Sequence, residues 1–164
     1  MWDLKVEALA VLIVICPGAN AQKIKPFVLL PSTAAHGISR FCSREGVSNI
    51  TGSWRPNKND IQRLESRLPL ISSLRSAGEL NGVQIQHPDR YYRQYIAVVV
   101  GNHKMIYVNA FSDDPLPPWR TGLVDVCDSG PSGWGVLYDP IRGEFSSLRV
   151  NSTLAVPPPP PERQ

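Results

Sequence analysis

The clearest periodic pattern of apolar residues in the chain is that of an amphipathic helix. Ile61, Leu64 and Leu68 recur at helical spacing, and charged side chains stand between them. Asn57 precedes the pattern and is a residue type that favours helix N-caps, while Pro69 disfavours continuation of the helix through the residue before it. The pattern therefore predicts one main helix between Asn57 and Leu68, followed by a short second helical stretch.

From residue 91 onward the pattern changes to short runs of β-branched and aromatic residues, which favour strands. Gly101-Asn102 joins the first two runs and suits a tight hairpin turn. The sequence Asp139–Gly143 forms another turn, between the last two runs. Two pairs of runs predict a four-stranded antiparallel meander: Tyr95–Val100 with Met105–Phe111, and Leu123–Cys127 with Trp134–Tyr138. The turn after the second pair leads into a last run, Glu144–Val150.

Such a sheet must bury its apolar face, and the helix is the only large apolar partner in the pattern. The sequence therefore predicts an α+β domain over residues 54–154, with one main helix packed on the four-stranded antiparallel meander in a cystatin-like arrangement. Residues 22–53 are predicted to be mostly irregular, with a short edge strand at Phe27–Leu30. Residues 155–164 form a Pro-rich tail that we expect to be extended and outside the core.

The first 21 residues have the layout of a secretory signal peptide. The apolar run Ala8–Ile15 is far shorter than the roughly 20 residues that a bilayer-spanning helix needs. We therefore expect cleavage after Ala21, export to the periplasm or beyond, and no stable membrane span in the mature chain. Two acidic residues near the start weaken the positive head of the segment, so an uncleaved anchor stays an alternative, and Cys16 leaves lipidation as another.

Export changes the expectation for the cysteines. Two remain in the mature chain, Cys42 and Cys127, and an oxidising compartment favours pairing them. We therefore predict one disulfide between these two residues. A zinc site or a cysteine nucleophile are the alternatives, but isolated cysteines lack the paired spacing of metal sites.

Composition and charge are those of one ordinary globular domain. The chain has 164 residues, of which 42% are hydrophobic and 19% charged. Its net charge of +3 comes from 17 basic and 14 acidic residues scattered along the sequence. A field this weak does not favour a nucleic-acid partner.

Short motifs rich in aromatic residues are spread over residues 50–151. They are Trp54-Arg55-Pro56, Asp60-Ile61, Leu64-Glu65, Arg93-Gln94-Tyr95, Ile106–Ala110, Val126-Cys127-Asp128 and Trp134–Pro140. This set resembles a group of small exported bacterial proteins of unknown function. The resemblance implies export and a bacterial setting, and it implies no activity.

The residues that could carry catalysis or bind a metal show no recognisable spacing. His36, His87 and His103 are 51 and 16 residues apart, so they predict neither a metal site nor any other cofactor. A small secreted hydrolase is an alternative function, with Asp128, Ser129 or His103 as its reactive groups. A histidine close to one of the other two groups in a pocket would support it.

Two loops are longer than their connections need, Ser112–Arg120 and Asp128–Gly133, and long loops on a rigid sheet often bind partners. The leading hypothesis is a non-catalytic exported binding module for an envelope or secreted protein, such as an inhibitor or immunity-type partner of an envelope enzyme. A passive envelope component is a further alternative. If the prolines only stiffen the first loop, Trp119 and Trp134 belong to the core instead. The predicted binding residues are Asp113, Asp114, Trp119, Arg120, Asp128, Ser129 and Trp134.

Overall fold

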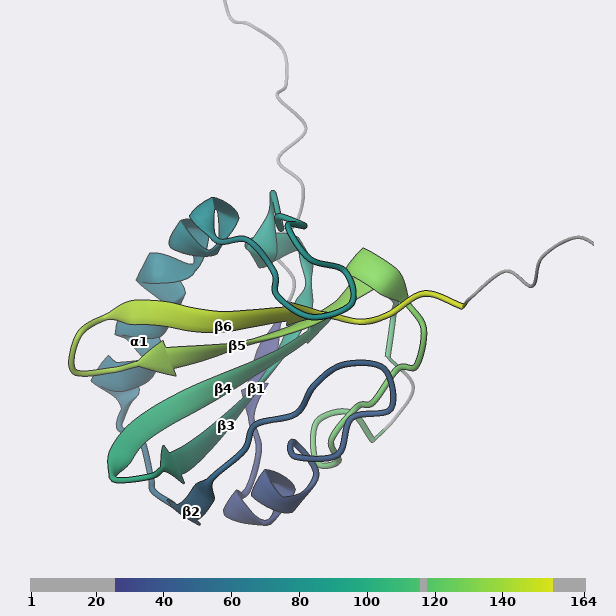
Figure 1. The fold of residues 1–164 in the computed structure, drawn as a ribbon. Coiled ribbons are helices and arrows are strands. Elements are labelled where there is room, and N and C mark those ends of the chain that lie inside the picture. The colour runs from purple at the N-terminus through teal and green to yellow at the C-terminus, as the bar shows by residue number, and fades with distance from the viewer. Residues whose placement is uncertain (1–25, 116–117, 155–164) are drawn as a thin grey trace, which may run out of the picture.

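The computed structural model describes residues 26–115 and 118–154, and these residues build a mixed β-sheet with one α-helix packed on it (Figure 1). The predicted signal peptide and the Pro-rich tail lie outside the described residues. The strands are β1 (Phe27–Leu29), β2 (Ile50–Ser53), β3 (Tyr92–Val100), β4 (His103–Phe111), β5 (Gly133–Asp139) and β6 (Glu144–Val150). The helices are α1 (Lys58–Arg67) and the short 3-10 helices η1 (Ser32–His36), η2 (Leu68–Ser73), η3 (Pro88–Arg90) and η4 (Gly130–Ser132).

The sheet is larger than predicted and its strands are not all antiparallel. β3, β4, β5 and β6 are antiparallel neighbours in chain order. On the remaining edge of β3, β1 pairs in parallel and β2 pairs antiparallel further along. The predicted four-stranded antiparallel meander, and with it the cystatin-like arrangement, is therefore wrong. β3 has nine residues, and the two short N-terminal strands pair with an edge that would otherwise be unpaired.

The helix α1 forms where the sequence predicts it. The Asn57 side chain accepts a hydrogen bond from the Asp60 amide at 3.0 Å, and the Asp60 carboxylate accepts one from the Asn57 amide at 2.8 Å. This reciprocal capping box satisfies two backbone donors at the start of the helix. The helix ends at Arg67, and the chain continues as η2, whose second residue is Pro69. Within the described ranges, no helix is long and apolar enough to cross a membrane.

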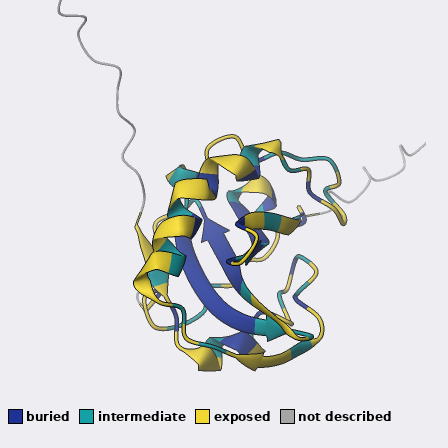
Figure 2. Cartoon of the chain, turned by 90° about the vertical axis from the view of Figure 1, so that its left-hand side faces the viewer, coloured by how far each residue is buried: buried dark blue, intermediate teal, exposed yellow. Residues whose placement is uncertain are grey.

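One face of the sheet carries the larger apolar core, under α1 and η2. Leu64, Leu68 and Ile71 are buried there against Tyr95 and Trp134 of the sheet. Figure 2 looks onto this side, where the helix has an exposed outer surface and the strands behind it are buried. The predicted packing of one helix on the sheet is confirmed for this face.

The opposite face of the sheet is covered by irregular segments, which the predicted architecture did not include. A second apolar cluster forms between them and the strands, from Leu30, Ala35, Ile38, Val47, Ile96, Val98 and Tyr107. Cys42 and Cys127 form the predicted disulfide on this side, and both residues are exposed at the surface. The disulfide joins the segment that follows η1 to the segment that precedes η4.

The predicted strand Leu123–Cys127 is wrong, because its backbone is bound by side chains instead of by another strand. The Gln94 amide donates to the carbonyls of Trp119 and Gly122, the second at 2.7 Å, and its Oε1 accepts from the Val124 amide at 2.9 Å. Asn109 donates to the Val124 carbonyl at 2.8 Å. These amides are buried on the sheet and fix an irregular path for this segment.

Arg44 binds the irregular segment between η1 and β2 to buried amide side chains of the sheet region. Its Nε donates to the Tyr107 hydroxyl at 3.1 Å, and its two Nη atoms donate to the side-chain oxygens of Asn109 and Asn151. The guanidinium also lies 3.8 Å from the centre of the Phe41 ring. We call Arg44, Gln94, Asn109 and Asn151 the amide network. It holds both irregular segments on the sheet.

Substitution of Gln94 by Met removes the hydrogen bonds of the most heavily used amide while keeping the length of the side chain. The buried carbonyls and the amide that it satisfies lose their partner, so the free energy of unfolding should fall by about 3 kcal/mol or more. Denaturant unfolding measures the change. Gln62→Met, on the exposed side of α1, is the matched control and should unfold like the wild type. Equal stability of the two variants would contradict the role of the network.

Reduction of the disulfide should lower the free energy of unfolding by roughly 4 to 5 kcal/mol in the loop-entropy model, because the bond closes a loop across a separation of 85 residues. Denaturant midpoints with and without a reducing agent measure the effect. The double variant Cys42→Ser with Cys127→Ser should match the reduced protein and should not respond to the reducing agent. A reduced protein as stable as the oxidised one would contradict this account.

Candidate functional site

The first predicted binding loop is anchored by aromatic packing. Trp119 is buried and lies edge-on to Tyr92, with ring centroids 5.5 Å apart. The Tyr92 hydroxyl donates to Asp114 at 2.6 Å, and the guanidinium of Arg120 lies 4.7 Å from the centre of the Trp119 ring. The tryptophan therefore belongs to the structure of the loop, while Asp113, Asp114 and Arg120 are exposed.

The residues of the second predicted loop also contact the framework. Trp134 is fully buried in the helix-side core. The Ser129 hydroxyl accepts a hydrogen bond from Asn151 at 2.8 Å, and Asp128 accepts one from the Ser152 hydroxyl at 3.1 Å. These three residues are therefore occupied by contacts that shape the loop.

The two loops start from the same end of the sheet, where the Ser112 amide donates to the Ser132 carbonyl at 2.8 Å. None of the cavities described below is lined by any of the seven predicted binding residues. A binding role for the two loops stays a prediction.

The reactive groups of the hydrolase alternative lie at opposite ends of the sheet. His103 opens β4, whereas Asp128 and Ser129 lie beyond the other end of this nine-residue strand, roughly 26 Å away at the rise of an extended chain. In the described ranges, no histidine side chain hydrogen-bonds to a serine or a carboxylate. No group of three His, Cys, Asp or Glu side chains there is placed to hold a metal ion.

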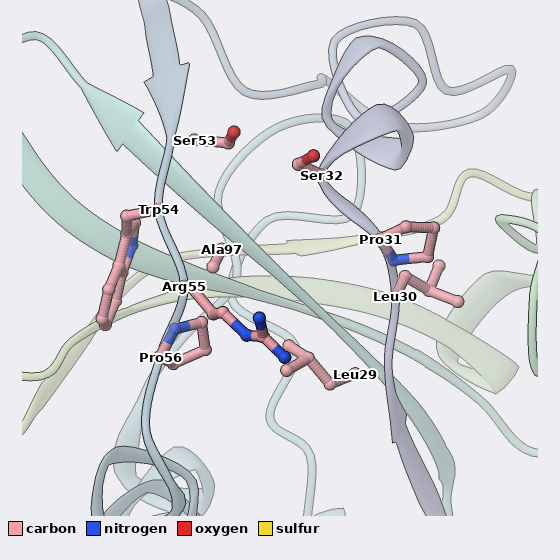
Figure 3. A pocket seen from close by; sticks show the side chains of 9 residues that line it. All are labelled: Leu29, Leu30, Pro31, Ser32, Ser53, Trp54, Arg55, Pro56 and Ala97. Atoms are coloured by element: carbon pink, nitrogen blue, oxygen red, sulfur yellow. The ribbon is translucent and has the colours of Figure 1, made fainter.

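A cavity opens where the outer edge of β3 is interrupted. β1 pairs with β3 as far as Tyr95, and β2 pairs from Val98, so Ile96 and Ala97 lie in the register of neither strand. The cavity at this interruption has a volume of about 550 Å³, which is in the range of ligand sites. We call it the edge slot (Figure 3); it is lined by Leu29, Leu30, Pro31, Ser32, Ser53, Trp54, Arg55, Pro56 and Ala97.

The two walls of the edge slot are held in place by contacts to the sheet. On one wall, the Leu30 amide donates to the Tyr95 carbonyl at 2.9 Å. On the other, the Trp54 indole donates to the Met105 carbonyl at 2.9 Å, and Pro56 leads directly into the cap of α1. The slot is therefore a fixed feature of the fold.

In the part of the chain that the structure describes, Arg55 is the only charged residue that lines the edge slot. Its side chain is exposed and points from its own wall across the slot toward β1 (Figure 3). Among the described residues, its guanidinium has no hydrogen-bond or ion-pair partner. An unpaired planar cation beside apolar walls favours a carboxylate or another planar or tetrahedral anion.

Next to the edge slot lies a second, polar cavity of about 390 Å³, between η1 and β2. The two cavities share Ser32 and Ser53 in their walls. We call the second cavity the polar channel, and both together the edge groove. The channel is lined by Ser32, Ala35, His36, Ser39, Val47, Ser48, Asn49, Ile50, Thr51, Gly52 and Ser53. The edge groove is therefore elongated, with an apolar end that carries the Arg55 cation and a polar end lined by hydroxyl and amide side chains and by His36.

The sequence prediction missed the edge groove because its walls come from segments without periodic patterns. Residues 29–32 and 53–56 are separated in the chain and meet only because both flank β3. The one usable signal was Trp54-Arg55-Pro56, an exposed arginine between an aromatic residue and the proline that precedes α1.

A buried charged cluster lies under β1 on the helix side of the sheet. The Arg93 guanidinium is fully buried, 3.3 Å from the Glu65 carboxylate, and donates to the Tyr95 hydroxyl at 3.1 Å. The Tyr95 hydroxyl donates in turn to Glu65, and the Phe27 ring stacks on Tyr95 with centroids 5.2 Å apart. The cluster satisfies its own donors and acceptors and lines neither part of the edge groove, so we assign it a structural role.

All five tyrosines are harder to ionise in the fold than in an open chain. Burial raises the pKa of Tyr95 well above its ordinary value of 10.0, and the Glu65 carboxylate raises it further. Burial is also the main cause of the raised pKa of Tyr91, Tyr107 and Tyr138. For Tyr92, the hydrogen bond to Asp114 is the main cause of the raised pKa.

Comparison with known proteins finds no match for this chain among family models, curated proteins or solved structures. The resemblance to small exported bacterial proteins therefore stays a prediction.

The raised tyrosine pKa values predict a loss of stability in alkali. Below the ordinary pKa of 10.0, both states hold their tyrosine protons and the fold keeps its full stability. Above it, the unfolded chain releases protons that the folded chain retains, so the free energy of unfolding falls as the pH rises. Denaturant unfolding across this range measures the fall, and ultraviolet absorbance of tyrosinate follows the ionisation. Tyrosines that ionise freely at pH 10 in the folded protein would contradict the prediction.

Proposed function

We propose that this protein is an exported, non-catalytic binding module that holds an extended segment of a partner protein in the edge groove. The observation that carries the proposal is the shape of this groove: it is elongated, it runs along β2, and it has an apolar end and a polar end. A long narrow site with these two ends suits a stretch of polypeptide better than a compact small molecule.

The position of β2 supports a peptide ligand. β2 pairs with only one strand, β3, so its other edge has no strand partner among the described residues. Its residues are small apart from Ile50, and Thr51, Gly52 and Ser53 are exposed. Unpaired backbone groups on an exposed strand are a template for an added extended chain.

Export of the protein is part of the proposal. The disulfide fits an oxidising compartment, and the first 21 residues have the layout of a signal peptide. The partner would then be an envelope or secreted protein. Inhibition of such a partner would follow if the bound segment belonged to its active site.

The test is a selection of random peptides displayed on phage, against the full chain exported through its own signal and purified in oxidised form. We expect enriched peptides that bind the wild type and lose about tenfold or more in affinity for Ser53→Trp, because an indole at this position fills the junction of slot and channel. Ser66→Trp, on the exposed surface of α1, is the control and should bind like the wild type.

The proposal fails if no peptide is enriched, or if the enriched peptides bind Ser53→Trp as well as they bind the wild type. Thermal unfolding of both tryptophan variants verifies that a loss of binding is not a loss of fold.

A further inference from the structure

The charge along the edge groove is positive only, among the residues that the structure describes. Among the described residues, no Asp or Glu lines either the edge slot or the polar channel, and Arg55 is the one residue there that carries a fixed charge. The ligand segment therefore meets a permanent positive charge at Arg55, and the complementary ligand carries a negative group at the apolar end of the groove.

The location of Arg55 restricts where this negative group lies in the peptide. Ser32 and Ser53 stand at one end of the edge slot, next to the polar channel, while Arg55, Leu29 and Pro56 stand at the other (Figure 3). A chain that enters from the channel reaches the guanidinium only after passing Ala97. Because the Arg55 side chain crosses the slot there, the arginine meets the end of the chain more readily than its middle.

The walls next to Arg55 are apolar and provide few backbone donors. Leu29 and Pro56 flank the guanidinium, and Pro31 and Pro56 have no amide hydrogen with which to continue strand pairing. The floor at Ala97 is a single methyl group, which leaves room for a side chain of the ligand. This end of the slot is therefore suited to a terminal residue with an apolar side chain and a free carboxylate.

We infer that the edge slot binds the free C-terminus of the partner chain, with the terminal carboxylate paired to Arg55 and the terminal apolar side chain over Ala97. This inference rests on the proposed function, because it names the part of the peptide that the edge groove holds. A guanidinium pairs with a carboxylate through two parallel hydrogen bonds, which gives the site a preference for this group.

The experiment uses two random peptide libraries, one displayed with free C-termini and one with both ends joined to the carrier. Selection on the oxidised full chain should enrich peptides from the first library, with apolar final residues. The most enriched peptide is then synthesised as the C-terminal acid and as the C-terminal amide. The acid should bind about tenfold or more tightly than the amide.

Arg55 variants connect this preference to the residue. In Arg55→Gln the acid should lose about tenfold or more in affinity and bind no better than the amide, and Arg55→Lys should retain part of the preference. Arg90→Gln removes an exposed arginine outside the groove and should keep the wild-type preference.

The outcomes separate the inference from the proposed function. Peptides that bind equally well as acid and amide, and that still lose affinity for Ser53→Trp, would overturn the C-terminal assignment and leave the peptide groove standing. An acid preference that persists unchanged in Arg55→Gln would also overturn the assignment. If neither library yields a peptide, the inference and the proposed function fail together.

Discussion

The structure depends on the need to satisfy polar side chains that are buried on the sheet. Gln94 and Asn109 lie opposite each other on β3 and β4, on the face away from the helix, and neither is exposed to water. An unpaired amide at such a position is costly, so each must find partners within the protein. The carbonyls of the irregular segment after Trp119, together with Arg44, supply them. Irregular segments that bind these side chains therefore cover this face of the sheet, in place of the second helix or sheet that would normally do so.

The same constraint explains which parts of the fold could be predicted from the sequence. Periodic apolar residues identified α1 and the β3–β4 hairpin, and the pairing of Cys42 with Cys127 followed from their number and the expected compartment. The segment Leu123–Cys127 has the composition of a strand, yet its backbone partners are side chains far away in the sequence. Nothing in a local pattern distinguishes a β-branched residue in a ladder from one held by an amide. β1 and β2 are placed by pairing with the open edge of β3, and no local sequence pattern predicts this pairing either.

The candidate site follows from the way in which that open edge is filled. Two short strands approach β3 in opposite directions and stop before they meet, which leaves the edge slot between them. In the first loop that the sequence favoured as a binding segment, Trp119 is buried against aromatic side chains of the sheet, and Trp134, next to the second loop, is buried within β5. A local sequence pattern does not distinguish a loop that covers a sheet from one that faces a partner.

The disulfide also affects the mechanics of the edge groove. The walls of the edge slot are the two ends of one continuous stretch, which leaves Ser32, passes through Cys42 roughly halfway, and returns at Ser53. Cys42 is fixed to Cys127, on a segment that the amide network holds against the sheet. The disulfide therefore fixes the middle of this stretch to the sheet, while its two ends form the walls of the edge slot. Widening the groove must therefore bend the chain between Ser32 and Cys42 or between Cys42 and Ser53. The whole stretch cannot move as one rigid body.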